Sequence, residues 1–333
     1  MVDRRIAIVE AAYDLEIPQN EFLTELGQPM RESLDGVSAY VFEISQRDGR
    51  FVLSDHQSED PRVAEQLQRT VATLPQEMLN LFFGTPLLAT SSSDVLASGG
   101  IEFDSTLLPT LYAEVGFKDV FAMSAFDPLG DGVGLGVGLR ERSGPPQEQR
   151  VLWTQVAAHV AAAFRLRRRL GGRKAVEQAS AVLRTDGKLD HAESGVDAEQ
   201  RELLRQAVDR VERARVRGRE TQEALELWQS LIGGQWSLAD HFEGNGRRFY
   251  VAVRNPPEIA ESKALTRREA EVVSYLACGT KTQTAAYALG LDEVTVRGYL
   301  RTALSKLGMR SRAELIAVRS MLVERRRIEP CEA

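Results

Sequence analysis

The most regular hydrophobic pattern of the chain lies near its C-terminus, between residues 289 and 307. Apolar side chains recur there at the three- and four-residue spacing of an α-helix, at Val296, Leu300, Ala303, Leu304 and Leu307. The opposite face carries small, basic or hydroxylated side chains and one valine, at Val294, Gly298, Arg301, Thr302 and Ser305. The pattern predicts a helix with one core face and one outer face that another molecule can approach closely.

Three more short helices are predicted around this one, at 267–278, 282–289 and 312–325. Thr266 and Glu269 have the spacing of a capping box, and Asp292 stands where it can cap the 289–307 helix. Glycines that end helices follow at Gly279, Gly290 and Gly308. Four short helices with joints of three or four residues form a helix-turn-helix layout. In such a motif the second helix, here the one at 289–307, enters the DNA major groove.

The first 170 residues alternate between strand-like and helix-like patterns. Strands are predicted at 37–44, 50–54, 119–126 and 132–140. Asp48-Gly49 is a strong hairpin signal between the first two. Helices are predicted at 62–74, 76–83, 105–115 and 147–170, with a polar loop at 91–100. The order predicts a sheet with helices bracketing it.

A second, smaller sheet is predicted in the middle of the chain. A hairpin over 181–191 is centred on Asp186-Gly187, and a strand pair follows at 235–242 and 247–254. Helices at 197–217 and 221–232 separate the two pairs. Short polar joints are predicted at 170–175 and 256–263.

Charge is unevenly distributed along the chain. Residues 262–333 hold thirteen Lys and Arg against eight Asp and Glu, a net charge of +5, although the whole chain has a net charge of −6. A basic C-terminal module on an acidic body is what a polyanion-binding domain joined to a regulatory part would look like. The N-terminal sequence is not a signal peptide, and no apolar run is long enough to span a membrane, so we expect a cytoplasmic protein.

Motifs for catalysis, metals or cofactors were not found in the sequence. Cys278 and Cys331 have no metal-binding spacing, and the four histidines are scattered. His159 is therefore expected to be a core or interface residue. The glycines of 132–138 alternate with aliphatic residues, which predicts a strand with one bare face open to close approach, not a phosphate loop. We expect no enzymatic activity and no cofactor.

The C-terminal segment, LTRREAEVVSYLACGTKTQTAAYALGLDEVTVRGYLRTALSKLGMRSRAEL, resembles the LuxR-type helix-turn-helix of bacterial transcription regulators. The resemblance covers about 264–322. Its anchors are Leu265, Thr266, Arg268, Glu269, Glu271, Val272, Gly279, Ala286, Leu289, Thr295, Val296, Arg297, Lys306, Leu307, Gly308 and Arg312.

This resemblance implies roles for seven residues in DNA binding. The family's base-contacting positions fall on Arg297, Gly298 and Arg301, and its phosphate or backbone contacts fall on Lys281, Thr282, Thr295 and Lys306. It also implies that Glu269 pairs with a basic residue of the last loop, here Arg310. Gly298, Ala303 and Thr284 depart from the family pattern, which bears on the target sequence and the affinity more than on the fold.

The other two segments resemble sensor domains. The sheet of the first 170 residues, with its long exit helix, is similar to GAF domains, and AVLRTDGKLDHAE at 181–193 looks like the opening of a small PAS domain. The expected fold class is α+β multidomain, with two antiparallel sheets flanked by helices and an all-α four-helix domain. The expected domains are 1–170, 175–257 and 262–333.

The sequence therefore predicts a one-component transcription regulator, controlled by a small-molecule ligand or a regulatory protein at its N-terminal domains. The acidic pocket of a phosphoacceptor receiver domain was not found in the N-terminal strands. Expected partners are double-stranded DNA and a second copy of the chain, with no membrane. Candidate dimer surfaces are the helices at 147–170, 197–217 and 312–325. The alternative is a non-enzymatic sensor whose helix-turn-helix mainly dimerises or docks a protein.

Overall fold

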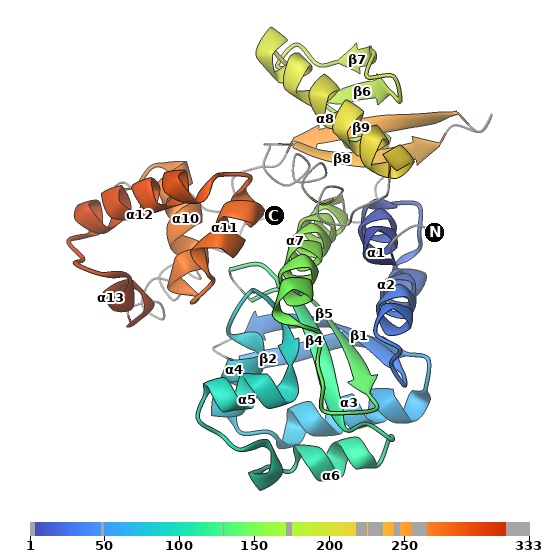
Figure 1. The fold of residues 1–333 in the computed structure, drawn as a ribbon. Coiled ribbons are helices and arrows are strands. Elements are labelled where there is room, and N and C mark those ends of the chain that lie inside the picture. Colours follow the sequence, from blue (N-terminus) through green and yellow to red (C-terminus); the bar gives the residue numbers. More distant parts are fainter. Residues whose placement is uncertain are drawn as a thin grey trace.

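The computed structural model contains two antiparallel sheets and a C-terminal module of helices (Figure 1). It describes residues 4–47, 50–128, 130–170, 175–217, 225, 236–242, 247–254 and 265–317. The mixed fold with two antiparallel sheets, predicted from the sequence, is confirmed. The GAF-like and PAS-like character of the sheets stays a prediction, as do the three domain boundaries. Most of both predicted joints, and the Asp48-Gly49 turn, lie outside the described residues.

The first sheet has five strands in the order β2-β1-β5-β4-β3, each antiparallel to its neighbours. Its strands are β1 (Ala39–Arg47), β2 (Arg50–Ser58), β3 (Leu87–Ser91), β4 (Asp119–Phe126) and β5 (Gly132–Leu139). The two predicted strand pairs are therefore present, and β1 joins them by pairing with β5. The strand β3 lies at one edge of the sheet.

Two helices, α2 (Gln19–Ser33) and α7 (Gln147–Leu170), cover one face of this sheet, and α1 (Arg4–Tyr13) packs against both of them (Figure 1). The aliphatic residues of β5 point towards this face, and Val133, Leu135 and Val137 are almost fully buried there. Trp153 and Phe121 meet edge to face between α7 and the sheet. Burial of large apolar side chains on this face holds α7 to the sheet.

The opposite face is covered by α3 (Pro61–Thr73), α4 (Gln76–Phe83), α5 (Ser92–Ser98) and α6 (Leu108–Ala113). Here the predicted bare face of β5 is filled by aromatic rings. A Cβ atom on Gly134 would collide with the Phe42 ring, and one on Gly136 would collide with the Tyr40 ring. The close approach expected from the glycines is therefore made by aromatic side chains of neighbouring elements.

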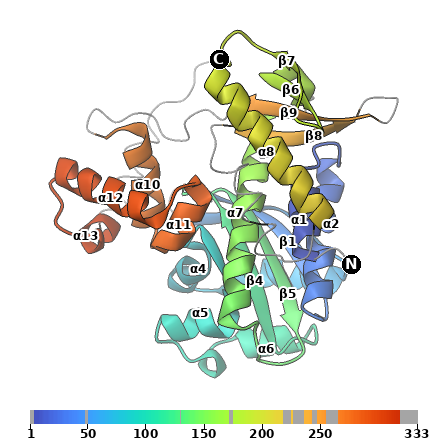
Figure 2. The same ribbon diagram turned by 45° about the horizontal axis from the view of Figure 1, so that its top comes forward.

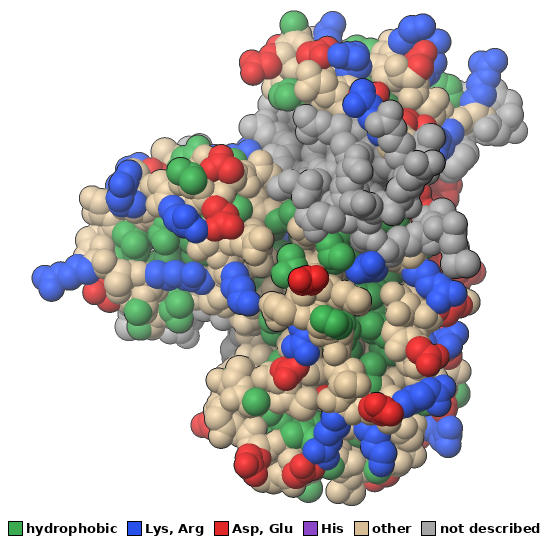
Figure 3. Space-filling view, in the orientation of Figure 1, with side chains coloured by type: hydrophobic (Ala, Val, Ile, Leu, Met, Phe, Trp, Pro, Cys, Tyr) green, Lys and Arg blue, Asp and Glu red, His purple; other side chains and the backbone are tan. Residues whose placement is uncertain are grey.

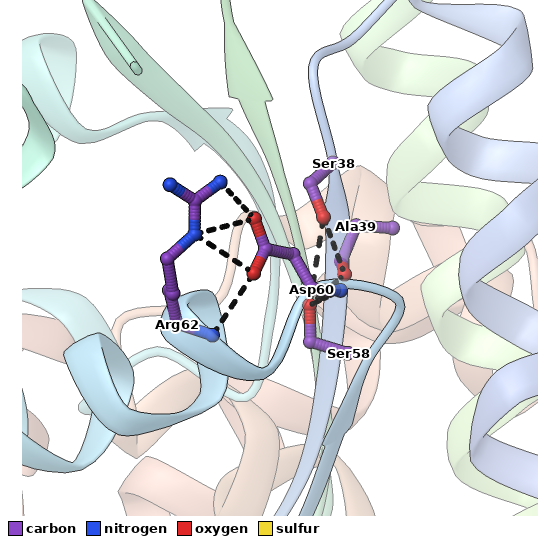
Figure 4. A network of polar contacts seen from close by, with 5 residues as sticks. All are labelled: Ser38, Ala39, Ser58, Asp60 and Arg62. Atoms are coloured by element: carbon purple, nitrogen blue, oxygen red, sulfur yellow. Dashed lines mark hydrogen bonds and ion pairs between the residues drawn. The ribbon is translucent and has the colours of Figure 1, made fainter. Parts of the chain in front are cut away.

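A small polar network fixes the start of α3 at the end of β2 (Figure 4). The Ser58 hydroxyl donates to the Ala39 carbonyl at 2.7 Å, which ties β2 to β1. Asp60 then accepts from the Arg62 backbone amide at 3.0 Å and from the Arg62 guanidinium at 2.6 Å. Asp60 is thus the N-cap of α3, and Pro61 occupies the first helical turn where a missing amide hydrogen costs little.

The prediction of a polar loop at 91–100 is wrong. This segment contains the helix α5, which follows the strand β3, and β3 was not predicted either. The serines bond inward to buried partners. Ser93 donates its hydroxyl to the Asp119 carboxylate, and the Ser92 hydroxyl lies 2.8 Å from the Tyr112 hydroxyl. Burial raises the pKa of the fully buried Asp119 carboxyl. Serine-rich segments are usually solvated loops, and the sequence alone does not show that these serines have buried hydrogen-bond partners. The segment was therefore predicted as a loop.

The second sheet has the strand order β7-β6-β9-β8 and is entirely antiparallel. Its strands are β6 (Ala181–Arg184), β7 (Leu189–Ala192), β8 (Trp236–Phe242) and β9 (Arg248–Arg254), and α8 (Ala198–Arg217) lies against it (Figures 1 and 2). Glu212 of α8 binds both the Arg248 guanidinium, at 2.5 Å, and the Tyr250 hydroxyl. Of the helix predicted at 221–232, only Leu225 is among the described residues.

The helix α7 is enclosed within the chain. It contacts α1, the first sheet, β8 and a helix of the C-terminal module, and Val156, Val160 and Ala163 are completely buried. The expectation that 147–170 offers a dimer surface is therefore wrong along its central turns, because other segments of the same chain cover them. No described helix is long and apolar enough to cross a lipid bilayer.

Candidate nucleic-acid interface

The C-terminal module contains four helices, as predicted: α10 (Arg267–Ala277), α11 (Thr282–Leu289), α12 (Glu293–Leu307) and α13 (Arg312–Ala317). The predicted glycine ends are present, with left-handed backbone at Gly279, Gly290 and Gly308. The predicted extension of the last helix to 325 lies outside the described residues beyond 317.

The start of α10 is fixed by the predicted capping box. Glu269 accepts from the Thr266 backbone amide at 2.7 Å, and Thr266 accepts from the Glu269 amide at 3.4 Å. The Lys306 ammonium lies 2.9 and 2.7 Å from the two Glu269 carboxylate oxygens. Hydrogen bonds from Lys306 and from the Thr266 amide lower the pKa of the Glu269 carboxyl. The expected pairing of Glu269 with Arg310 is therefore wrong, since Lys306 at the end of α12 reaches the carboxylate instead.

Arg312 fastens α13 to the rest of the module. Its guanidinium donates to the Thr280 carbonyl at 2.6 Å and to the Leu276 carbonyl at 3.4 Å. Both carbonyls lie near the end of α10, where helix carbonyl groups have no partner within the helix. The lysine and arginine contacts together set α12 and α13 against α10.

The turn between α11 and α12 is short and well hydrogen-bonded. Gly290 adopts φ 62°, and the Leu291 amide donates to the Ala286 carbonyl at 2.9 Å. Asp292 then caps α12 by accepting from the Thr295 amide and the Thr295 hydroxyl, both at 2.7 Å. These hydrogen bonds lower the pKa of the Asp292 carboxyl. The turn fixes the direction in which α12 leaves the module.

The two faces of α12 differ as the sequence predicts. Val296 and Ala303 are fully buried, whereas the side chains of Arg297 and Arg301 are exposed. Gly298 lies between the two arginines, and apart from its chain neighbours and the backbone of α12 no atom of the described residues stands within 4 Å of the position that a Cβ would take. The outer face is therefore basic at two positions and open between them, which suits close contact with the edges of base pairs.

The seven predicted DNA-contacting residues differ in their positions and partners. Arg297, Gly298 and Arg301 lie together on the outer part of α12, as predicted. Thr295 lies in the same helix, but its hydroxyl is bonded to Asp292. Lys306 is bound to Glu269, a structural pair that the sequence did not indicate. The last two, Lys281 and Thr282, begin α11. Whether any of the seven contacts DNA stays a prediction.

Arg297 and Arg301 differ in what surrounds them. The Arg297 guanidinium lies 2.6 Å from the Glu293 carboxylate, one turn earlier in α12. Among the described residues no ion pair involves Arg301. The Arg297–Glu293 pair is exposed and therefore weak, so the arginine can leave it for a phosphate or a guanine at little cost. Figure 3 shows Lys and Arg side chains standing out over this module.

A cleft of about 640 Å³ separates the start of α11 from the N-terminal half. One wall is formed by β3 and the first turns of α7, including Thr90, Arg150 and Thr154. The other wall is formed by α11 and the start of α12, including Lys281 and Gln283. Lys281, one of the predicted backbone-contacting residues of the module, therefore faces another part of the same chain.

Beside this cleft, α11 is in direct contact with α7 (Figure 1). The Tyr287 hydroxyl donates to the Leu225 carbonyl at 2.7 Å and lies 3.0 Å from the Nε2 atom of His159. His159 is completely buried, also meets the Tyr13 ring edge to face, and burial lowers its pKa to about 3. His159 is thus a core and interface residue, as predicted. The neighbouring Cys278 thiol lies 3.5 Å from the Pro128 carbonyl.

Sequence reasoning did not identify Tyr287 or Glu293 as residues of interest. Tyr287 is the one aromatic residue of α11 and is buried. A buried tyrosine hydroxyl usually has a hydrogen-bond partner. Glu293 precedes Arg297 by four residues, the spacing of a helical ion pair. The sequence therefore contained a local indication for each residue. However, the partner of Tyr287 is His159, 128 positions away, and the spacing of neighbouring residues does not predict such a distant contact.

Comparison with known proteins agrees with the geometry of this module. Residues 263–319 match the family model described as "Bacterial regulatory proteins, luxR family". Over 72 residues the chain is 36% identical to the transcriptional regulatory protein DesR of Bacillus subtilis (strain 168), an alignment that covers 22% of this chain. The chain spans 36% of the length of DesR.

Two solved structures of SdiA align over most of the chain. One is SdiA in complex with octanoyl-rac-glycerol and the other is Escherichia coli SdiA, with TM-scores of 0.34 and 0.33 and 12% identity in both cases. They cover 96% and 95% of this chain and 95% of each SdiA chain. Scores this low establish no common fold for the whole chain. The family match and the four-helix geometry show that residues 263–319 form a LuxR-family helix-turn-helix domain.

Proposed function

We propose that the protein is a bacterial transcription regulator that binds double-stranded DNA sequence-specifically through α12. The observation that carries this proposal is the outer face of α12, where exposed Arg297 and Arg301 flank the open position of Gly298. An arginine can donate two hydrogen bonds to the edge of guanine, and a glycine lets the helix backbone approach the groove floor. The family match of residues 263–319 supports the same conclusion.

The start of α11 completes the proposed contact. Lys281 is exposed and immediately precedes the first turn of this helix, whose free amides can bind a phosphate. Phosphate contacts set the position of a protein on the duplex, whereas base contacts set its sequence preference. We therefore assign α11 to positioning and α12 to specificity. We propose no enzymatic activity and no cofactor.

The N-terminal segments are proposed to control this activity as one-component sensors, without a receiver domain. The contact between α7 and α11 supports such coupling, because Tyr287 and His159 join the module to the core of the N-terminal half. A DNA backbone at the start of α11 would need the space of the 640 Å³ cleft, which lies against β3 and α7. Docking on α7 and DNA binding are therefore proposed to compete. A small molecule or a regulatory protein that favours one state would then control the other.

A homodimer is also part of the proposal, since recognition helices of this class act in pairs on half-sites about one helical turn apart. The outer faces of α8 and α13 are the remaining candidate surfaces. The alternative function is a sensor whose helix-turn-helix serves protein docking. The same α7–α11 contact favours it, because that contact already uses one face of the module to bind protein.

Selection of bound sequences from a random duplex pool with the full chain tests the proposal. We expect one enriched motif with two related halves, and loss of the enrichment in Arg301→Ala. This substitution should weaken binding to the selected duplex by about 1 to 3 kcal/mol if the arginine donates two hydrogen bonds to guanine.

Thr154→Ala serves as the matched control, because this half-buried residue of α7 lies on the wall of the cleft opposite the module. Its enriched motif should be the same as that of the unaltered chain. An unselected pool, or an Arg301→Ala variant with the same motif and affinity, would contradict the proposal.

A further inference from the structure

The outer face of α12 carries one large apolar side chain that the helix core does not use. Val294 is 75% exposed, the most exposed large hydrophobic residue of the described part of the chain, whereas Val296 two positions later is completely buried. Val294 belongs to none of the apolar clusters of the described core. Its isopropyl group therefore makes no described contribution to the folding of the module.

The position of Val294 in the helix places it beside the proposed base contacts. It lies in the first turn of α12, directly after Glu293 and the cap at Asp292. In helix-turn-helix proteins the N-terminal residues of the recognition helix are those that contact base edges. Val294 and Gly298 are four residues apart, so they occupy the same face on successive turns.

Gly298 leaves that face open next to Val294. Apart from the flanking residues and the backbone of α12 itself, the described part of the chain places no atom within 4 Å of where a Cβ of Gly298 would stand. A side chain in a helix leans towards the turn before its own position, so a larger residue at 298 would cover part of the surface beside Val294. With glycine there, a group on the groove floor can reach the valine methyls.

The docking of the module against β3 and α7 does not cover Val294. The neighbouring Asp292 and Glu293 line the cleft towards β3 and α7, but Val294 does not. It therefore remains accessible while the module is docked against α7. The first charged residues on either side of Val294 in the sequence, Glu293 before it and Arg297 after it, form an ion pair with each other.

We propose that Val294 is a specificity-determining residue that contacts the 5-methyl group of a thymine in the major groove. The inference rests on the proposed DNA-binding function and adds a base preference to it. Among the major-groove edges only thymine presents a methyl group, which apolar side chains recognise by contact. Arginine contacts account for guanine, and the Val294 contact accounts for an adjacent thymine.

Replacement of thymine by uracil removes this methyl group and leaves the base pairing unchanged, so it isolates the proposed contact. The full chain is titrated with the duplex that it selects, in which each thymine is replaced singly by uracil, and binding is followed by fluorescence anisotropy. We expect that one thymine position in each half-site is sensitive. Replacement of a single thymine at such a position should weaken binding by about fourfold, the effect of one buried methyl group.

The same titration with Val294→Ala, which removes both γ-methyl groups, should show a smaller difference in affinity between the thymine and uracil duplexes at that position. Val294→Thr keeps one methyl group and should restore part of the discrimination. Leu107→Ala, which removes an exposed aliphatic side chain just before α6 in the N-terminal part of the chain, is the matched control and should keep the full thymine preference. Because Val294 is exposed, none of its substitutions is expected to unfold the module.

The inference is overturned if no single uracil weakens binding, or if Val294→Ala retains the same discrimination as the unaltered chain. Failure of the proposed function looks different, because then no duplex is selected from the random pool. A selected motif without a thymine that depends on Val294 leaves DNA binding in place and removes only the role of this residue.

Discussion

Arg297 and Arg301 point from the same helix but have different partners before DNA is bound. Arg297 is held by Glu293, whereas no ion pair of Arg301 is found among the described residues. Between them, Gly298 weakens α12, because glycine in a helix interior is less stable than alanine by about 1 kcal/mol. The same glycine leaves open space on the outer face of α12, where the helix can approach the groove floor closely.

Gly298→Ala should therefore stabilise the folded chain while impairing the proposed contact. The structure leaves room for the added Cβ, and alanine lowers the entropy of the unfolded chain. We expect the free energy of unfolding to rise by about 0.5 to 1 kcal/mol, measured by urea denaturation of the full chain. A decrease would show that the added methyl group meets a neighbour absent from this structure.

At the scale of whole elements, α11 is the helix with two uses. Its start lines the cleft that faces β3 and α7, and its Tyr287 joins the buried polar contact with His159 and the Leu225 carbonyl. Competition between these contacts and a DNA backbone gives the N-terminal half a physical means of control.

Tyr287→Phe tests this competition. The change keeps the ring but removes the hydrogen bond from the Tyr287 hydroxyl to the Leu225 carbonyl, and the loss of one such bond costs about 0.5 to 1.5 kcal/mol. If docking and DNA binding compete, the docked state loses stability and the measured affinity for the selected duplex rises, by about tenfold for each 1.4 kcal/mol.

Tyr250→Phe is the matched control, since it removes a tyrosine hydroxyl bonded to Glu212 in the second sheet, away from the module. It should leave DNA affinity unchanged. Equal affinities for the unaltered chain and Tyr287→Phe would mean that docking does not limit DNA binding.

The elements most accurately predicted from the sequence were those with explicit end signals. The capping box at Thr266 and the glycines that follow α10, α11 and α12 act within a few residues of the ends they define. The strand β3 and the helix α5 were missed because their polar residues bond to distant partners, as Ser93 does to Asp119. The spacing within α12 was enough to place Arg297 and Arg301 on its outer face. The partner of Glu269 was predicted wrongly, because it depends on contacts between different helices. Lys306 reaches Glu269 from 37 positions away.

At the scale of the whole molecule, one apolar core links the three parts of the chain. Trp153 of α7, Leu238 of β8 and Leu276 of α10 belong to the same buried cluster. His159 lies inside this cluster, where Tyr13 from α1 and Tyr287 from α11 face its ring. A change of protonation at this residue is therefore expected to affect how the parts hold together.

The sign of this effect follows from the lowered pKa of His159, about 3 in the folded chain against 6.5 for the free side chain. As the pH falls below 6.5 the unfolded chain takes up a proton before the folded chain does. The contribution of His159 to stability is therefore complete above pH 6.5 and is lost as the pH falls towards 3, by at most about 1.4 kcal/mol per pH unit.

His159→Gln keeps a polar group near the Tyr287 hydroxyl but does not titrate. Urea denaturation between pH 5 and 7 should show a smaller loss of stability on acidification in this variant than in the unaltered chain. The difference between the two slopes removes the contribution of carboxyl groups that titrate in both. Identical slopes would contradict the assignment of this pH dependence to His159.

The central claim, that α12 gives this protein sequence-specific DNA binding, is tested most directly by one ratio. The dissociation constant of the full chain is measured for its selected duplex and for a scrambled duplex of the same composition, at one physiological salt concentration. Specific regulators bind their sites roughly a thousandfold or more tightly than other DNA. We predict a ratio of this order that collapses in Arg301→Ala; a ratio near one in the unaltered chain would contradict the claim.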